Sequence, residues 1–162
     1  MLIEKIISGG QTGVDRAALD AAISNRVQHG GWCPRGRLAE DGVIDGCYIL
    51  EETSSMDYAV RTRLNVRDSD GTLILKTGRL EGGTALTAKL AGSLDKPMLI
   101  MDVDQPLPRG QIDDWITSHN IKVMNIAGPR ESKQPGIYRK AYDLLDQLLK
   151  NKHGVTEDTK GI

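Results

Sequence analysis

Short apolar runs alternate along the chain with longer segments in which apolar residues recur at helical spacing. Residues 2–8 form the first run, which predicts a strand that ends at Gly9 and Gly10. Residues 12–25 show the second pattern, which is typical of a helix with one buried face. The chain therefore opens with a strand, a tight glycine turn and a helix.

The same succession recurs along the rest of the chain. Further strands are predicted at residues 72–76, 97–102 and 121–127, and further helices at residues 84–93, 108–119 and 135–150. Strands that alternate with helices favour parallel pairing through crossover helices, which then cover both faces of the sheet. We therefore predict a Rossmann-like α/β fold, a three-layer α/β/α sandwich with a mainly parallel sheet.

Residues 29–55 interrupt this pattern because they are rich in glycine and in charged side chains. They predict a long shaped loop with one strand near residues 47–50, followed by a helix around residues 57–66. The whole fits a single domain over residues 1–150, with the polar residues 151–162 as a flexible tail.

Composition narrows the class of partner. The chain of 162 residues is 39% hydrophobic and 27% charged, which is ordinary for a globular protein. Its formal net charge is −1, so it has no excess of Lys and Arg to neutralise nucleic-acid phosphates. Its apolar runs are too short to span a bilayer, and residues 1–10 do not resemble a signal peptide. These features predict a cytoplasmic protein that binds neither nucleic acid nor membranes.

The cysteines and histidines do not predict a metal site. Cys33 and Cys47 form no C-x-x-C pair, and no second cysteine cluster completes a zinc site. His29, His119 and His153 are scattered without ligand spacing. We predict neither a metal held by protein ligands nor a disulfide.

Glycines gather at the end of the first predicted strand, in the sequence Ser-Gly-Gly-Gln-Thr-Gly-Val-Asp-Arg of residues 8–16. Absent side chains let a ligand approach the backbone, and free N–H groups in the first turn of a helix attract an anion. Gly10, Gln11 and Thr12, flanked by Gly9 and Gly13, are the natural cradle for a phosphate. The turn matches neither a Walker A loop nor the G-x-G-x-x-G motif, which disfavours an ordinary P-loop NTPase or NAD enzyme.

The same turn also permits a purely structural interpretation. Thr12 and Asp15 have the spacing of a capping box, with Thr12 as the N-cap of the helix. A capping box does not account for the doubled glycine, which favours the approach of a ligand. Arg16 is either a solvated helix residue or a partner of the phosphate.

A second glycine turn follows the predicted strand at residues 72–76. Gly82, Gly83 and Thr84 stand at the start of another predicted helix and form a second candidate anion site. Open parallel sheets bind ligands at the carboxyl ends of their strands, where the strand order reverses. The two turns converge there if their strands are neighbours, so we predict that strands 2–8 and 72–76 are adjacent.

Further polar residues are expected around the same edge of the sheet. Arg130 follows the strand at residues 121–127 and contacts either the ligand or an acid such as Glu131. One face of the helix at residues 57–66 carries additional candidates for the lining of the pocket, namely Tyr58, Arg61, Arg63 and Asn65.

These motifs together carry a resemblance to a known family. They are residues 8–20, Gly-Trp-Cys-Pro-Arg-Gly-Arg at 31–37, Asn-Val at 65–66, Ser-Asp-Gly-Thr at 69–72, Gly-Gly-Thr at 82–84 and Ala-Gly-Pro-Arg-Glu-Ser at 127–132. Over roughly residues 3–149 the chain resembles the molybdenum cofactor carrier proteins, within the Rossmann-like SLOG superfamily that also contains the LOG-type nucleotide hydrolases.

The resemblance implies a homo-oligomer that holds a phosphate-bearing small molecule. That molecule would be the molybdenum cofactor, a pterin also called molybdopterin, or, as in relatives within the superfamily, a nucleotide-derived ligand. The resemblance also implies that the phosphate lies against residues 9–13 and 82–84, with Arg61, Asn65 and Asp70 nearby.

Two other functions are compatible with the motifs. LOG-type relatives cleave the bond between base and ribose in nucleoside monophosphates, and their P-G-G-x-G-T-x-x-E motif ends in a Glu where this chain has Thr87. A neutral hydroxyl does not stabilise positive charge at the ribose, so we assign no catalytic residue and expect binding without turnover. The third possibility is a domain that senses a nucleotide signal.

Overall fold

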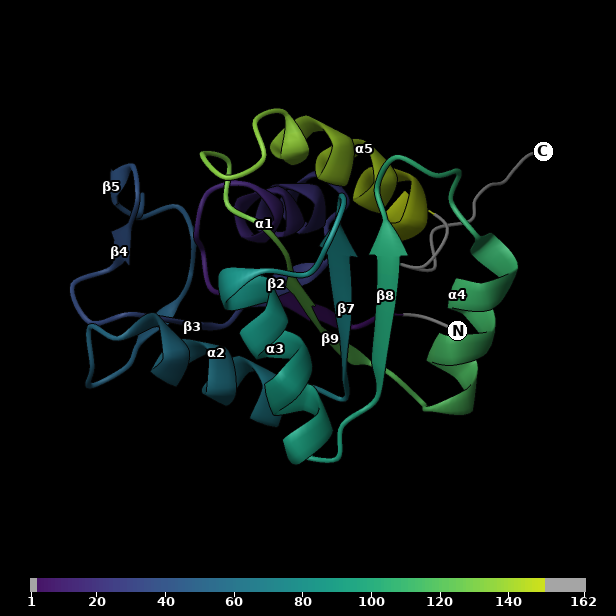
Figure 1. Ribbon diagram of the computed structural model, residues 1–162, viewed down its shortest axis with the longest axis horizontal. Coiled ribbons are helices and arrows are strands. Elements are labelled where there is room, and N and C mark those ends of the chain that lie inside the picture. The colour runs from purple at the N-terminus through teal and green to yellow at the C-terminus, as the bar shows by residue number, and fades with distance from the viewer. Residues whose placement is uncertain (1–2, 151–162) are drawn as a thin grey trace.

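The computed structural model describes residues 3–150, and in it five strands form one parallel sheet (Figure 1). The strands are β1 (Lys5–Ile7), β2 (Gln28–Gly30), β7 (Gly71–Lys76), β8 (Met98–Asp102) and β9 (Val123–Ala127). Every neighbouring pair is parallel, which confirms the predicted sheet. The predicted tail of residues 151–162 lies outside the described residues.

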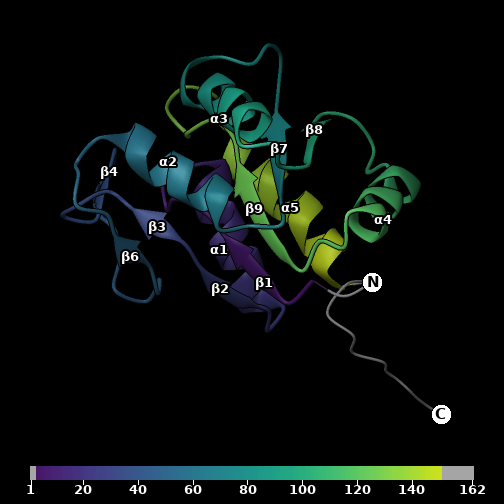
Figure 2. The ribbon, with the colours of Figure 1, turned by 90° about the horizontal axis from the view of Figure 1, so that it is seen from below.

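Helices cover both faces of the sheet (Figure 2). They are α1 (Val14–Ser24), α2 (Tyr58–Arg67), α3 (Gly82–Ser93), α4 (Arg109–Ser118) and α5 (Ile137–Lys150). Helices α2 and α3 lie together on one face, while α1, α4 and α5 contribute to one apolar core on the other. The predicted three-layer α/β/α sandwich is confirmed.

Successive side chains of the central strands point alternately toward the two helical layers. Leu73 and Leu75 of β7, with Met124 and Ile126 of β9, are buried in the core shared with α1 and α5. Successive side chains of a strand point to opposite faces, so Asn125 faces the other layer, under α2 and α3. The main apolar core thus forms on one face of the sheet, and the polar side chain of Asn125 lies on the opposite face.

The order of the strands corrects one prediction. The order is β2-β1-β9-β7-β8, so β9 separates β1 from β7, and the predicted adjacency of the first strand with the strand at residues 72–76 is wrong. When counting begins at β9 and continues through β1, β2, β7 and β8, the order across the sheet becomes 3-2-1-4-5. That is the standard Rossmann order with the chain ends moved. The last strand in sequence is therefore the central strand of the sheet.

Residues 31–57 leave the main sheet as an irregular excursion. It contains two small sheets, formed by β3 (Trp32–Cys33) with β6 (Glu51–Glu52) and by β4 (Leu38–Ala39) with β5 (Gly42–Val43). The strand predicted near residues 47–50 is wrong, because the chain turns there and the hydroxyl of Tyr48 donates to Asp20 instead. Within residues 3–150, no helix combines the length and apolarity needed to cross a membrane.

Candidate functional site

A cleft of about 220 Å³ opens at the carboxyl edge of the sheet, beside the first turn of α3. The strand end of β9, the first glycine turn and the second glycine turn all contribute to its lining. Strands β7 and β8 point toward this edge, where α3 begins (Figure 1). In the rotated Rossmann order, β9 and β7 flank the point where the order reverses, which is the usual ligand position in open α/β sheets.

The first turn of α3 presents unpaired backbone N–H groups to the cleft. The N–H groups of Thr84 and Ala85 both donate to the carbonyl of Glu81, whereas those of Gly82 and Gly83 have no acceptor among the described residues. Gly82 has φ of +53°, which suits glycine, and a side chain at Gly83 would meet no atom within 4 Å. This terminus is therefore open to an approaching anion.

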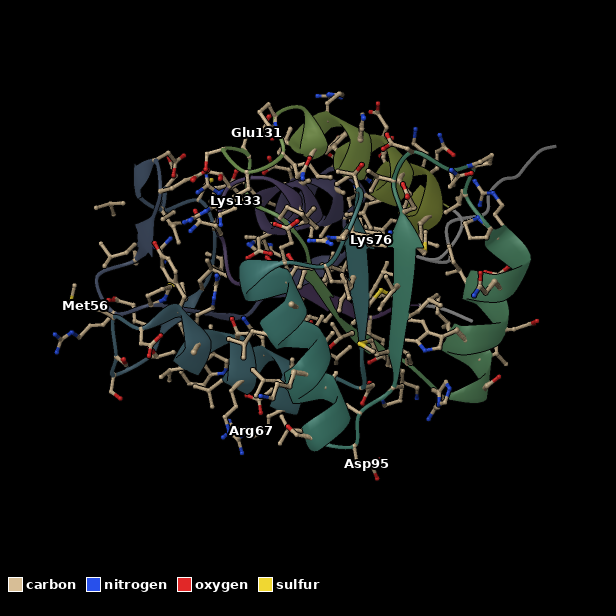
Figure 3. All side chains as sticks on the ribbon, in the orientation of Figure 1. Met56, Arg67, Lys76, Asp95, Glu131 and Lys133 are labelled. Atoms are coloured by element: carbon tan, nitrogen blue, oxygen red, sulfur yellow. The ribbon has the colours of Figure 1, made fainter. Side chains whose placement is uncertain are left out.

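Basic side chains surround that terminus. Lys133 Nζ lies 3.8 Å from the position that a Cβ on Gly82 would take, and Lys133 projects above the first turn of α3 (Figure 3). Arg79, Arg61 and Arg130 also line the cleft. Neither Arg79 nor Lys133 pairs with a carboxylate within residues 3–150. Basic residues outnumber the acidic ones in the lining, which are Asp15 and Glu81.

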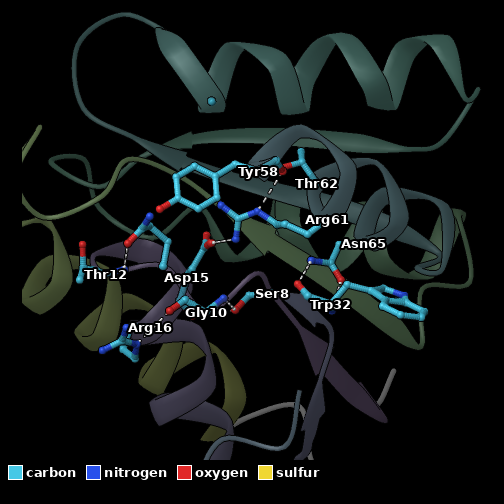
Figure 4. Close-up of polar contacts among 12 residues, drawn as sticks. Ser8, Gly10, Thr12, Asp15, Arg16, Trp32, Tyr58, Arg61, Thr62 and Asn65 are labelled. Atoms are coloured by element: carbon cyan, nitrogen blue, oxygen red, sulfur yellow. Dashed lines mark hydrogen bonds and ion pairs between the residues drawn. The ribbon is translucent and has the colours of Figure 1, made fainter. Parts of the chain in front are cut away.

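A buried ion pair forms the wall opposite α3. Arg61 reaches from α2 to Asp15 on α1, with Nη1 3.2 Å from Oδ2, and both side chains are about one-tenth exposed (Figure 4). The ring of Tyr58 lies alongside, 5.3 Å from the guanidinium carbon. Burial raises the pKa of the Asp15 carboxyl, although the charge of Arg61 opposes that shift.

Nine residues predicted for the site line this one cleft. They are Gly9, Gln11, Tyr58, Arg61, Asn65, Gly82, Gly83, Thr84 and Arg130. Arg63, the remaining candidate on α2, is exposed and does not line it. Glycine at position 9 was predicted to let a ligand approach the backbone. In the structure the Arg61 side chain takes that space instead, because a Cβ on Gly9 would lie 1.6 Å from Nη1 of Arg61.

Two of these residues have partners that the sequence did not reveal. Arg130 lies 3.6 Å from Glu40, a residue of the excursion, which confirms the predicted alternative of an ion pair with an acid, although that acid is not Glu131. Glu131 instead accepts from the N–H groups of Gly136 and Tyr138 at the start of α5. Asn65 is engaged at both ends of its amide by the backbone of Trp32.

The remaining predicted residues of the first turn face away from the cleft. Gly10, with φ of +78°, packs under the excursion, where a Cβ would lie 2.8 Å from Leu50. Arg16 donates to the carbonyl of Gly10 and to both carboxylate oxygens of Asp41. The predicted phosphate cradle over residues 10–12 is therefore covered on the Gly10 side.

Thr12 and Gly13 hold the turn against the chain that follows β9. The hydroxyl of Thr12 donates to Glu40 and accepts from the N–H of Glu131. Gly13 packs against the backbone of Pro129 and Arg130, where no Cβ fits. Gly13 itself is the N-cap of α1 and no side chain caps the helix, so the capping box of Thr12 and Asp15 is wrong.

Asp70 lies at the opposite end of the sheet. It precedes β7, and its Oδ2 accepts from the N–H groups of Lys122 and Val123 at the start of β9. It therefore joins the amino ends of two strands, far from the carboxyl edge. Its assignment to the ligand site is wrong.

Lys133 lines the cleft although no pattern in the sequence predicts it, because a single basic residue in a loop carries no signal. Arg79 and Asn125 also line the cleft. Arg79 precedes the second glycine turn and Asn125 lies near the end of the predicted strand at residues 121–127, so both belong to segments predicted to reach this edge, although neither was assigned to the site. An amide inside the otherwise apolar strand Val-Met-Asn-Ile-Ala is unusual for a buried central strand, and this signal distinguishes Asn125.

The described residues contain no group of three or more His, Cys, Asp or Glu that could hold a metal ion. Cys33 is buried in the excursion and Cys47 is exposed, and neither lines the cleft. Any metal in this cleft would have to be carried by its ligand.

Comparison with known families agrees with the rotated strand order. Residues 6–149 match the model of the circularly permutated YpsA SLOG family. The chain belongs to this family. Its architecture also matches the crystal structure of a "putative molybdenum carrier protein" from Syntrophus aciditrophicus, at 50% sequence identity and a TM-score of 0.87. That match covers 92% of this chain and 95% of the other. A search of curated proteins gave no significant match.

Proposed function

We propose that this protein binds and carries a phosphate-bearing small molecule, and that this molecule is the molybdenum cofactor, molybdopterin. The observation that carries the proposal is the open N-terminus of α3, where Gly82 and Gly83 offer N–H groups beside Lys133. Such a terminus attracts a phosphate through its N–H groups and its dipole. The 50%-identical relative described as a putative molybdenum carrier supports the choice of cofactor.

The opposite wall suits the ring of a pterin. Tyr58 and the Arg61 guanidinium offer flat surfaces on which a heteroaromatic ring stacks. Molybdenum would be held by the sulfur atoms of the pterin itself, since the described residues include no cluster of metal ligands. The residues that would hold the cargo are thus those of the α3 terminus and of this wall.

A nucleotide hydrolase of the LOG type is the alternative function. The hydroxyl of Thr87 donates to the carbonyl of Gly83 within α3, so the position of the catalytic Glu is occupied by a neutral, engaged group. The nearby Asp15 is committed to Arg61. Incubation with nucleoside monophosphates should therefore release no free base, and release would favour the hydrolase.

The decisive experiment is mass spectrometry of small molecules released from protein purified from its native host. We expect a phosphate-bearing pterin in near-stoichiometric amount, and much less of it from a Gly83→Asp variant purified in parallel. Recovery of a nucleotide would change the assigned cargo. Recovery of no phosphate-bearing molecule would refute the carrier function.

We also propose that the carrier is a homo-oligomer, on the strength of the family resemblance, and that it is cytoplasmic, as the sequence analysis predicts. A subunit packed beside the cleft would shield a bulky cofactor from solvent. Light scattering of the purified protein at micromolar concentration tests this, and a monomeric mass would refute it.

A further inference from the structure

Besides Asn65, two buried amide side chains line the cleft. Gln11 follows β1 and is 6% exposed, and Asn125 lies within β9 and is 3% exposed. Asn125 stands opposite Ile7 on β1 and Thr72 on β7, so it lies deeper in the cleft than the loops above it. Neither side chain belongs to the terminus of α3.

The amide of Gln11 has a fixed orientation. Its Oε1 accepts from the N–H of Thr12 at 3.0 Å and from the N–H of Glu40 at 2.8 Å. Because two backbone donors identify this atom as the oxygen, the other end of the amide is the NH₂ group. Nε2 has no acceptor within residues 3–150, which leaves a hydrogen-bond donor unused in the cleft.

Asn125 makes a hydrogen bond through the nitrogen of its amide but not through the oxygen. Nδ2 donates to the hydroxyl of Thr72 at 3.2 Å, and Oδ1 has no donor within residues 3–150. Asn65, a buried amide in the same cleft, is engaged at both ends by Trp32. The contrast distinguishes an amide that holds the fold together from one that leaves an acceptor free.

Buried polar atoms without partners are rare in folded proteins because their lost hydration is not recovered. A central strand favours an apolar residue at position 125, so the amide there lowers the stability of the ligand-free protein. A ligand that hydrogen-bonds to both amides would recover this loss. The free donor of Gln11 and the free acceptor of Asn125 would then recognise the part of the ligand that lies away from its phosphate.

We propose, resting on the carrier function, that Asn125 and Gln11 are specificity-determining residues that recognise a lactam edge of the ligand. Asn125 Oδ1 accepts from a ring N–H, and Gln11 Nε2 donates to a ring carbonyl oxygen or ring nitrogen. Oxopyrimidine rings carry such an edge, whether in a pterin or in guanine. Tyr58 and Arg61 lie in the same cleft to cover the face of that ring.

The test compares the affinity of the purified, ligand-free protein for GMP, for a pterin phosphate ester and for inorganic phosphate, measured by calorimetry. Wild type should bind both ring-bearing probes more tightly than phosphate, and the tighter of the two identifies the source of the ring. Asn125→Val should weaken both ring-bearing probes about tenfold. It should leave phosphate affinity unchanged and leave the Tm of the empty protein unchanged or higher.

Gln11→Glu keeps an oxygen for the two backbone donors but replaces the free donor with a carboxylate oxygen. It should lower affinity for GMP more than affinity for phosphate. Asn125→Thr serves the same purpose as Asn125→Val if the latter does not fold. Asn25→Ala is the matched control, because Asn25 is a buried amide outside the cleft that donates to Ala21 and Asp146. It should lower the Tm and leave all affinities unchanged.

A lower Tm for Asn125→Val with an unchanged ratio of GMP to phosphate affinity would show a purely structural amide and overturn the inference. Equal affinity of wild type for phosphate and both ring-bearing probes would also overturn it, while leaving the phosphate site standing. Failure of wild type to bind any probe would refute the carrier function itself.

Discussion

At the scale of single residues, the cleft depends on contacts between positions that are remote in the sequence. Asp15 and Arg61 are 46 residues apart, and both were noticed in the sequence for other reasons. From the sequence, Asp15 was interpreted as part of a helix cap, and Arg61 was predicted to contact the ligand. Which acid meets which base depends on the distance between α1 and α2 after folding, and local spacing does not encode that distance.

Loss of the Arg61 charge should destabilise the protein in a pH-dependent way. In Arg61→Met the buried Asp15 carboxylate loses its partner, which costs about 3–5 kcal/mol of unfolding free energy near neutral pH. Burial already raises the folded-state pKa of Asp15 above its ordinary value, and removal of Arg61 raises it further. Stability attributable to this group is therefore present at low pH and is lost as pH rises through the raised pKa.

Thermal unfolding of both proteins from about pH 4 to about pH 8 checks this. The Tm deficit of Arg61→Met should be small at the acid end and should grow toward the alkaline end. Arg63→Met is the matched control, since Arg63 lies exposed on the same helix. A deficit for Arg61→Met that does not change with pH would contradict the prediction.

At the scale of elements, the sequence predicted the helices to within a few residues, most clearly α1 and α5, which each bury a continuous apolar face. The prediction failed at residues 47–50, where an apolar run packs by way of Tyr48 and Leu50 against a small separate core in the excursion. It also could not rank the two glycine turns as anion sites. At the first turn Arg61 packs against Gly9 and Leu50 against Gly10, whereas a side chain at Gly83 in the second turn would meet no atom within 4 Å.

The open terminus of α3 gives a substitution that separates binding from stability. Gly83→Asp places a carboxylate in open space in the first turn, where the helix dipole favours it by about 0.5 kcal/mol. The same charge repels a phosphate, so affinity for inorganic phosphate should fall about tenfold or more. Calorimetry and thermal unfolding of the variant provide the two measurements.

A second helix supplies the matched control. Gly110 occupies the corresponding position in the first turn of α4, also with no atom near a built Cβ, and it does not line the cleft. Gly110→Asp should raise stability by a similar amount and leave phosphate affinity unchanged. Equal effects of the two substitutions on affinity would argue against α3 as the anion site.

At the scale of the whole molecule, the sequence predicted the layers but not the order of the strands. Alternating strands and helices favour a parallel sheet, yet they do not indicate which strand lies in the middle. The usual expectation puts early strands at the centre, whereas here the last strand, β9, is central. The cleft was nevertheless predicted at the correct edge, because every carboxyl strand end lies there whatever the order.

The rotated order predicts that the chain can be opened elsewhere without loss of the fold. A permutant that begins at Pro106 and ends at Gln105, with residue 162 joined to residue 1, has the standard Rossmann order of strands. The new ends lie in an exposed loop between β8 and α4, and Pro106 has no backbone N–H to lose. The native ends are compatible with closure, because Ile3 and Leu149 belong to the same apolar core.

Because the core contacts are all retained, the free energy of unfolding should change by no more than about 1–2 kcal/mol, the scale of altered loop closure. Chemical denaturation measures it, and affinity for inorganic phosphate reports on the cleft. A permutant opened between Gly110 and Gln111, inside α4, should be much less stable because it interrupts helical hydrogen bonds. If the opening at Pro106 proved as damaging as the opening within α4, the position of the chain ends would be part of what stabilises this fold, and the rotation would not be a neutral rearrangement.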